Sequence, residues 1–377
     1  MKHLVAATVT SLGLISVQAQ TAPPAAGDTP LQWYGQLAAA VNHNTDWIAT
    51  EKATALGNSP LSASWLGLRG NRQFGNDLVG LYRIETGLDL ANGKAGSVLR
   101  IDPADPSKDV NKLFNRQAFV GLTYKSFVTA TVGRQFHAST DRVVQSVDLY
   151  NVAGTSLASA PLGLFGVNRF YGNDNRVDNS LKLRFRAPGD MTAAFSVARD
   201  SAAGDSHAFD LAKVNSQYAL GVYGASFTSP LARADGLKPK HTILGVGGHI
   251  NTGPWKLYAN VVNSDLDNAN PTRATQTNRI VHLGAAWQAS EKVTLRLGHY
   301  HDKGANINGL TTRSGTKTTL IGSLDYALDK DLTLQAGITQ NKLNDGYALD
   351  PVNRSALKLA NGNNATTGIT LGVRYTF

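Results

Sequence analysis

Basic side chains recur at every second position in parts of this chain, and Lys182, Arg184 and Arg186 are the plainest case. Side chains two residues apart on an extended strand point to the same face. Cations gathered on a low-dielectric wall attract anions, and they do so more strongly in a narrow space than at an open surface. The chemistry that this spacing offers is therefore electrostatic selection of charged solutes.

The densest group of possible catalytic or metal-binding residues is formed by His299, His301 and Asp302. The two histidines share a face, as metal ligands do. They fall on the same face of the strand as Leu295 and Leu297, however, and they lie where that strand meets a long loop. This favours an outer rim or a subunit contact over a catalytic site. The chain has no cysteine, which excludes disulfides, thiolate metal sites, thiol nucleophiles and iron–sulfur clusters. We therefore expect no enzyme, no cofactor and no metal.

Charged residues make up only 17% of the chain, against about 25% in an average protein. The hydrophobic share is 42%, and 36 basic against 27 acidic residues give a formal net charge of +9. The apolar content excludes simple disorder, and glycine without a fixed period excludes collagen. The basic residues are dispersed and are not interleaved with aromatic residues, so we expect no nucleic-acid partner.

The N-terminus has the pattern of a secretory signal peptide. A positive start is followed by an apolar run over 4–15, and Ala19 ends a small-residue cleavage motif. We expect a signal peptide at 1–19 and one barrel domain at 20–377. No later stretch approaches the roughly 18 apolar residues that a membrane-spanning helix requires, so we do not expect a helical membrane protein.

Apolar and polar residues then alternate in segments of about ten residues, each closed by turn-forming residues. In the last segment Ile369, Leu371, Val373, Tyr375 and Phe377 occupy one face. This period of two predicts antiparallel strands. Sixteen strands are expected, at residues 31–43, 61–70, 77–90, 114–124, 127–137, 177–187, 190–200, 207–213, 216–227, 241–252, 254–264, 278–289, 291–302, 316–328, 330–342 and 368–377. The segment 207–213 has the weakest pattern.

Short turns and long polar connections alternate along the chain, and the longest connection covers 138–176. A soluble β-sandwich turns its apolar face to a dry core and needs many charges on its outer faces. A transmembrane barrel instead turns its apolar face to lipid, with short turns at one rim and long loops at the other. The signal peptide, the scarcity of charge, the two loop classes and the aromatic residues at strand ends favour an all-β transmembrane barrel. The apolar share is then expected to form a lipid-facing belt and not a core.

With these features the sequence resembles the general (non-specific) porins of Gram-negative outer membranes, in particular the glycine-rich β-proteobacterial type. The resemblance covers nearly the whole mature chain. The segments that carry it are Trp33-Tyr34-Gly35, Trp65-Leu66-Gly67-Leu68-Arg69-Gly70, Ile84-Glu85-Thr86-Gly87-Leu88, Phe114-Asn115-Arg116-Gln117-Ala118-Phe119-Val120-Gly121-Leu122, Val132-Gly133-Arg134-Gln135, Asn175-Arg176-Val177-Asp178-Asn179-Ser180 and Gly372-Val373-Arg374-Tyr375-Thr376-Phe377.

The resemblance implies a water-filled channel for passive diffusion of small hydrophilic solutes and ions. It implies a homotrimer in contact with outer-membrane lipid and lipopolysaccharide, a third loop over about 138–176 that folds into each pore, and Phe377 as a signal for the barrel-assembly machinery. At the position of Trp65 the family usually has arginine, so the basic cluster of the constriction is expected to be thinner here.

Strand parity, with Arg116 added by the resemblance, sorts ten basic side chains to the inner face. They are Arg69, Arg83, Arg116, Lys182, Arg184, Arg186, Lys256, Arg296, Lys317 and Arg374, against the four acids Glu85, Asp89, Asp210 and Asp325. Residues 149–173 contain no acid. This imbalance predicts a weak preference for anions. The alternative interpretation is that the inner arginines are paired with loop acids such as Asp141 and Asp148.

The expected pore-lining and constriction residues are Arg69, Arg83, Arg116, Arg169, Arg176, Lys182, Arg184, Trp65, Leu164 and Phe165; the last two belong to the loop tip, and the resemblance supplies Arg169 and Arg176. A rival function is a channel selective for one carboxylate or phosphate solute, in which Trp65 and the apolar tip contribute an affinity site. An adhesin is less expected, because the sequence shows no passenger domain.

Overall fold

The computed structural model describes residues 28–46, 53–96, 113–150, 176–200, 204–229, 232, 236–267, 270 and 272–377. The predicted signal peptide at 1–19 lies outside these ranges, as does the part of the predicted constriction loop at 151–175.

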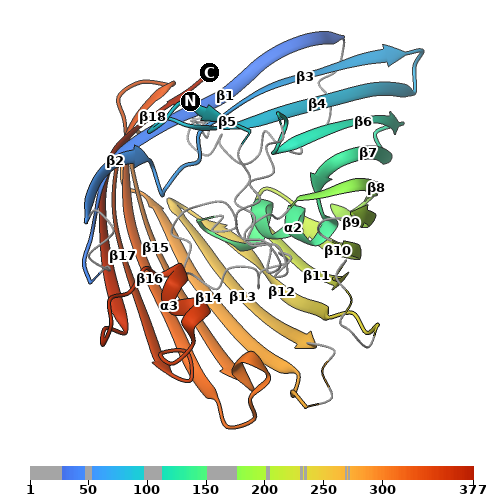
Figure 1. Ribbon diagram of the computed structural model, residues 1–377. Helices are drawn as coiled ribbons and strands as arrows, with labels where there is room; N and C mark the ends of the chain where they lie inside the picture. Colours follow the sequence, from blue (N-terminus) through green and yellow to red (C-terminus); the bar gives the residue numbers. More distant parts are fainter. Residues whose placement is uncertain are drawn as a thin grey trace, which may run out of the picture.

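The described chain forms one antiparallel sheet and a few short helical segments (Figure 1). The strands are β1 (Thr29–Asn44), β2 (Thr54–Asn58), β3 (Trp65–Phe74), β4 (Leu78–Asp89), β5 (Lys94–Ala95), β6 (Gln117–Tyr124), β7 (Val128–Phe136), β8 (Arg176–Ala187), β9 (Met191–Asp200), β10 (Gly204–Val214), β11 (Tyr218–Thr228), β12 (Lys240–Thr252), β13 (Trp255–Asp267), β14 (Gln276–Gln288), β15 (Val293–Ala305), β16 (Ser314–Ala327), β17 (Leu332–Asp345) and β18 (Ala365–Thr376). The helical segments are α2 (Ala138–Arg142), η1 (Val143–Val147), η3 (Ile307–Gly309) and α3 (Pro351–Ala356).

The sheet closes on itself, because β1 pairs with β18 as well as with β3. At the seam the amide of Gly35 donates to the carbonyl of Phe377 at 3.0 Å, and the amide of Phe377 donates to the carbonyl of Gly35 at 3.1 Å. Apart from the short β2 and β5, the described strands number sixteen, and each pairs with its neighbour in the ring. The predicted sixteen-stranded barrel is therefore confirmed, including its weakest member, which is β10.

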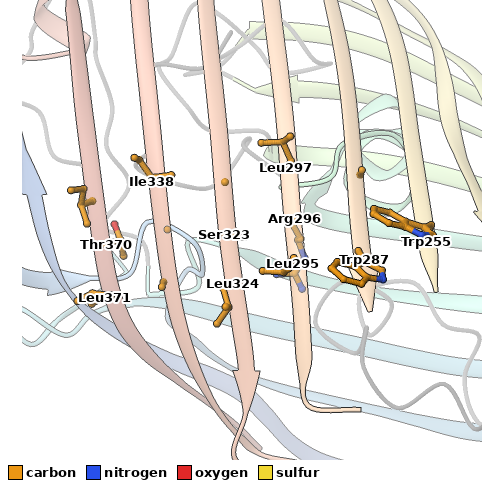
Figure 2. A pocket seen from close by; sticks show the side chains of 15 residues that line it. Trp255, Trp287, Leu295, Arg296, Leu297, Ser323, Leu324, Ile338, Thr370 and Leu371 are labelled. Atoms are coloured by element: carbon orange, nitrogen blue, oxygen red, sulfur yellow. The ribbon is translucent and has the colours of Figure 1, made fainter. Parts of the chain in front are cut away.

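The outer face is apolar, as the alternation predicted. Trp33 and Leu371 are exposed to 58% and 63%. A shallow groove lined mainly by apolar side chains crosses the outside of β13 to β18, and the rings of Trp255 and Trp287 stack at one end of it with their centroids 5.3 Å apart (Figure 2). Among the described residues no helix is both long and apolar enough to span a bilayer.

The expectation that the barrel has no apolar core is wrong for one side of the lumen. The inner faces of β11 to β16 carry a cluster that includes Tyr223, Ile243, Val262, Ile280 and Tyr300, all 2% exposed or less. Neighbouring residues in these strands, such as Ile280 and Val281, are apolar on both faces, so the alternation there is weak. The inner cluster is buried because chain from a loop covers it.

Glycines permit close packing within this wall. A Cβ at Gly245 would overlap the ring of Tyr223, and a Cβ at Gly248 would overlap the carbonyl oxygen of Ala219 on β11. The Gly245-Val246-Gly247-Gly248 run is thus a site of close strand packing.

Replacing Gly248 with alanine should destabilise the barrel by about 1–3 kcal/mol, because the backbone of β11 must move to admit the methyl group. Gly322→Ala is the control, since its Cβ would meet only Ile338, at 3.4 Å. Urea unfolding followed by tryptophan fluorescence measures both variants. Equal losses of stability in the two would contradict the packing explanation.

Candidate functional site

The described part of the loop between β7 and β8, residues 137–150, folds into the barrel and lies against the inner wall, with α2 inside the ring of strands (Figure 1). We call this segment the third loop. Val143, Val147 and Tyr150 pack on the apolar inner cluster, and the first two are fully buried. The described part of the loop therefore covers the side of the lumen lined by β9 to β16.

A buried ion pair holds the first turn of the loop. Arg142 Nη2 lies 2.8 Å from Asp210 Oδ1 on β10, and the side chains are 2% and 0% exposed. The same nitrogen donates to the Thr192 hydroxyl at 2.8 Å. Since both charges are desolvated, the pair is held by its hydrogen bonds as much as by attraction.

A second ionic contact involves two predicted pore residues. Asp141 Oδ2 lies 2.6 Å from Lys182 Nζ and 2.7 Å from Arg184 Nη2. Burial alone would raise the pKa of Asp141, but the cations of Lys182 and Arg184 hold that pKa below its usual range. Both basic side chains come from the inner face of β8, as predicted, yet the loop covers them and its own carboxylate balances part of their charge.

The far end of the described loop is held by tyrosines. The Tyr300 hydroxyl donates to Asp148 at 2.5 Å, and the Tyr150 hydroxyl lies 3.0 Å from both the Arg296 carbonyl and the Ser323 hydroxyl. The alternative interpretation, in which inner cations pair with loop acids, therefore describes the loop side of the lumen. There Asp141 pairs with both Lys182 and Arg184.

On the opposite wall, basic groups gather around two aromatic rings. Arg69 and Arg83 are directly opposite each other on β3 and β4. Their guanidinium carbons lie 4.5 and 5.9 Å from the Tyr34 ring centroid, within the range of cation–π attraction. Arg116 lies in the same way 5.4 Å from Trp65. We call Arg69, Arg83 and Arg116 the arginine cluster.

Glu85 is the acid at the base of this cluster, and it is fully buried. The Tyr34 hydroxyl donates to it at 2.6 Å, Gln117 donates at 2.9 Å, and Arg116 Nε lies 3.7 Å away. A buried carboxylate with this many hydrogen-bond partners fixes the groups around it. In the described wall the cluster thus combines three guanidinium groups with one carboxylate. The Tyr34 ring lies inside the barrel, although it is adjacent to the outward-facing Trp33.

A smaller basic group lies on β15 to β18. Arg296 and Arg374 approach Asp325 Oδ2 at 3.0 and 3.5 Å. Nearby, Lys317 Nζ is 4.0 Å from Asp302. Sequence reasoning left Asp302 out of the inner acids, although its parity with Arg296 on the same strand could have placed it there.

Other predicted residues lie apart from these groups. The Arg176 guanidinium carbon lies 4.3 Å from the Phe136 ring centroid at the start of β8. Arg169, Leu164 and Phe165 lie outside the described residues. Arg134 pairs with Asp178 at 2.6 Å, next to a register shift between β7 and β8.

The suspected histidine cluster does not converge. The rings of His299 and His301 lie 6.4 Å apart on the outward parity, whereas Asp302 points inward and accepts hydrogen bonds from Asn278 and Tyr347 at 2.8 and 2.9 Å. In the part of the chain that the structure describes, no group of three histidine or acidic residues is placed to hold a metal ion.

Comparisons with known proteins agree with this geometry. A family model described as Gram-negative porin matches residues 8–346. Among solved structures the chain is similar to an anion-selective porin from Comamonas acidovorans, with a TM-score of 0.70 and 16% identity over 92% of this chain and 99% of that one. It is also similar to a trimer form of OmpT from Vibrio cholerae (TM-score 0.64, 14% identity, 93% and 100% covered) and to OmpF from Salmonella typhi (0.61, 14%, 92% and 97%). No curated protein matches the sequence.

Substituting Arg142 with alanine should cost about 3–5 kcal/mol, because it leaves the Asp210 carboxylate buried with one cation fewer. Arg199→Ala is the matched control: Arg199 lies 2.8 Å from Asp205 as well, but the two side chains are 84% and 54% exposed. Urea unfolding measures stability, and the rate of proteolysis within the third loop reports its release. Similar effects of the two substitutions would show that the buried pair does not hold the loop.

The Asp141 contact predicts a pH dependence with a definite sign. A carboxyl whose pKa is lower when folded stabilises the protein above its unfolded pKa of about 3.8, and this contribution is lost as the pH falls through the folded value. Stability should therefore fall as acid is added below about pH 4. Asp141→Asn should be less stable at neutral pH and respond less to acid, because the titrating group is gone. Unfolding curves across this pH range test this, and identical pH profiles would contradict it.

Proposed function

The chain belongs to the Gram-negative porin family, and from this premise we propose that its water-filled channel carries small hydrophilic solutes and ions by passive diffusion, with a weak preference for anions. The family and the closed sixteen-stranded barrel make it an outer-membrane channel protein. The residues that set its selectivity are the proposal.

The observation that carries the anion preference is the arginine cluster. Three guanidinium groups lie around one fully buried carboxylate, on the wall opposite the third loop. Fixed cations beside a narrow aqueous path raise the local concentration of anions. Lys182 and Arg184 contribute less to the path, because Asp141 lies against both of them under the loop. The Comamonas acidovorans protein with a similar fold is an anion-selective porin, which agrees with this assignment.

General diffusion is favoured over a dedicated affinity site. Trp65 is only 6% exposed and lies beneath Arg116, with its ring 5.0 Å from that of Tyr34. A solute therefore has little access to the indole, which serves as a platform for the guanidinium. A channel selective for one carboxylate or phosphate solute is the alternative, and block of the current by that solute alone would favour it.

We also propose a homotrimer, exported by a signal peptide at 1–19 and assembled with the help of the terminal Phe377, in contact with outer-membrane lipid and lipopolysaccharide. A solved form of the Vibrio cholerae neighbour is a trimer. Phe377 is 42% exposed and its backbone pairs with Gly35 at the seam of the barrel, so its side chain is accessible. The separation of Asp302 from His299 and His301 supports a channel without catalytic activity.

The reversal potential of single channels in a KCl gradient tests the selectivity, and the unmodified protein should favour Cl⁻ over K⁺. The double substitution Arg69→Gln and Arg83→Gln should move the reversal potential toward K⁺, because it removes two cations from the wall. Arg199→Gln changes charge at an exposed pair and should leave selectivity unaltered. A preference for K⁺ in the unmodified protein, or an equal shift in both variants, would refute the assignment.

A further inference from the structure

The second strand of the barrel is interrupted. On β1, Ala39 pairs with Asn58 of β2 and Gln36 pairs with Trp65 of β3. Three residue steps along β1 therefore face seven along its partner, so that four residues are in excess of a continuous ladder. An ordinary bulge adds one residue. The surplus lies in residues 59–64, Ser-Pro-Leu-Ser-Ala-Ser, which we call the inner segment.

Both ends of the inner segment are tied to β1. The Ser59 amide donates to the Ala38 carbonyl at 3.1 Å, and the Ala38 amide donates to the Ser64 hydroxyl at 2.9 Å. Gln36 donates to the Ala63 carbonyl at 2.6 Å. These bonds satisfy the backbone of β1 where the strand ladder is missing, so the excursion is a built feature and not a frayed edge.

The middle of the segment extends across the inner wall, past β18 to β17. The Ser59 hydroxyl lies 3.3 Å from the Gln335 side chain, and Arg374 lies 3.4 Å from the Ser62 hydroxyl. Leu61 sits over Gly337, where a Cβ would lie only 3.0 to 3.4 Å from the leucine side chain. Leu61 can therefore pack at this position because Gly337 has no side chain.

The inner segment and the third loop pack against the same buried cluster. Leu61 packs against the same buried cluster as Leu149, a cluster that includes Tyr150 and Ile321. Chain from the start of the barrel and chain from the third loop thus cover adjacent parts of the lumen wall. Ser59, Ser62 and Ser64 are each less than 7% exposed, which shows that the segment is packed in place.

We propose that the inner segment is a second constriction element, which limits the size of solutes together with the third loop, and that Leu61 and Gly337 hold it in place. The proposal rests on the channel function. The segment carries no charge, so it narrows the path without neutralising the cations beside it. Its role is therefore to limit the size of solutes and not to select the sign of their charge, which separates it from the arginine cluster.

Deleting Pro60 to Ala63 removes the four surplus residues and leaves Ser59 and Ser64 to pair with β1 as a continuous strand. The barrel should still close. Slower gel migration of heated samples than of unheated ones checks this. Single-channel conductance should rise by about 1.5-fold or more, because the lumen of a sixteen-stranded barrel is wide once emptied, and liposomes should swell faster in larger sugars. A folded, conducting deletion variant with unchanged conductance and unchanged sugar cut-off would overturn the proposal. If the folded, unmodified protein conducts no ions, the proposed channel function is itself refuted.

A matched pair of single substitutions tests the anchor. Leu61→Ala should raise conductance or current noise, because it removes the side chain that packs over Gly337. Leu56→Ala, five residues earlier, alters a side chain that is 71% exposed and should leave both unchanged. Equal behaviour of the two variants would contradict the role of Leu61.

The chain has no cysteine, so an engineered pair reports position directly. Leu61→Cys with Gly337→Cys should form an intramolecular disulfide on mild oxidation, since the side chains are in contact range. Leu61→Cys with Gly322→Cys, on the outward face of the adjacent strand, should not. Failure of the first pair to cross-link in folded protein would show that the segment does not lie on β17, and would overturn the proposal.

Discussion

Backbone pairing around a closed ring governs how this chain places its side chains. In a bilayer every strand must find a neighbour on both sides, because an unpaired amide or carbonyl in hydrocarbon costs several kcal/mol. The seam between Gly35 and Phe377 removes the last free edge. Once the ring is closed, each side chain has only two destinations, outward to lipid or inward to the lumen. Every polar or charged group must therefore be accommodated inside or at the rims.

The lumen divides its charges between two tasks. Lys182, Arg184 and Arg142 lie under or within the third loop, where carboxylates at 2.6 to 2.8 Å balance them. Arg69, Arg83 and Arg116 lie on the opposite wall, on aromatic rings and around the buried Glu85. Removing one partner of a buried pair costs more than the intact pair contributes. The first group therefore has a mainly structural role, and the second is the group that we propose acts on solutes.

Apolar packing inside the barrel makes this division possible. A loop held by ion pairs alone would compete with water for every contact, but Val143 and Val147 are fully buried against β11 to β16. The inner segment, which comes from the start of the barrel, is also held by apolar packing, with Leu61 over Gly337. Burial of a leucine-sized side chain contributes about 1.5–3 kcal/mol. A few such contacts suffice to hold short stretches of chain in an otherwise aqueous space.

The ring could be predicted from the pattern of residues alone: the number of strands, their faces, the outward apolar belt and the inward orientation of Arg69, Arg83 and Lys182. These follow from a period of two, which is a local property of an extended chain. Parity tells which face a side chain occupies but not what covers it. It is in the folded barrel that Asp141 meets Lys182 and Arg184, that Tyr34 lies beneath Arg69, and that residues 59–64 leave the wall to reach β17. Those contacts join segments far apart in sequence, and the hydrophobic pattern of neither segment specifies its partner.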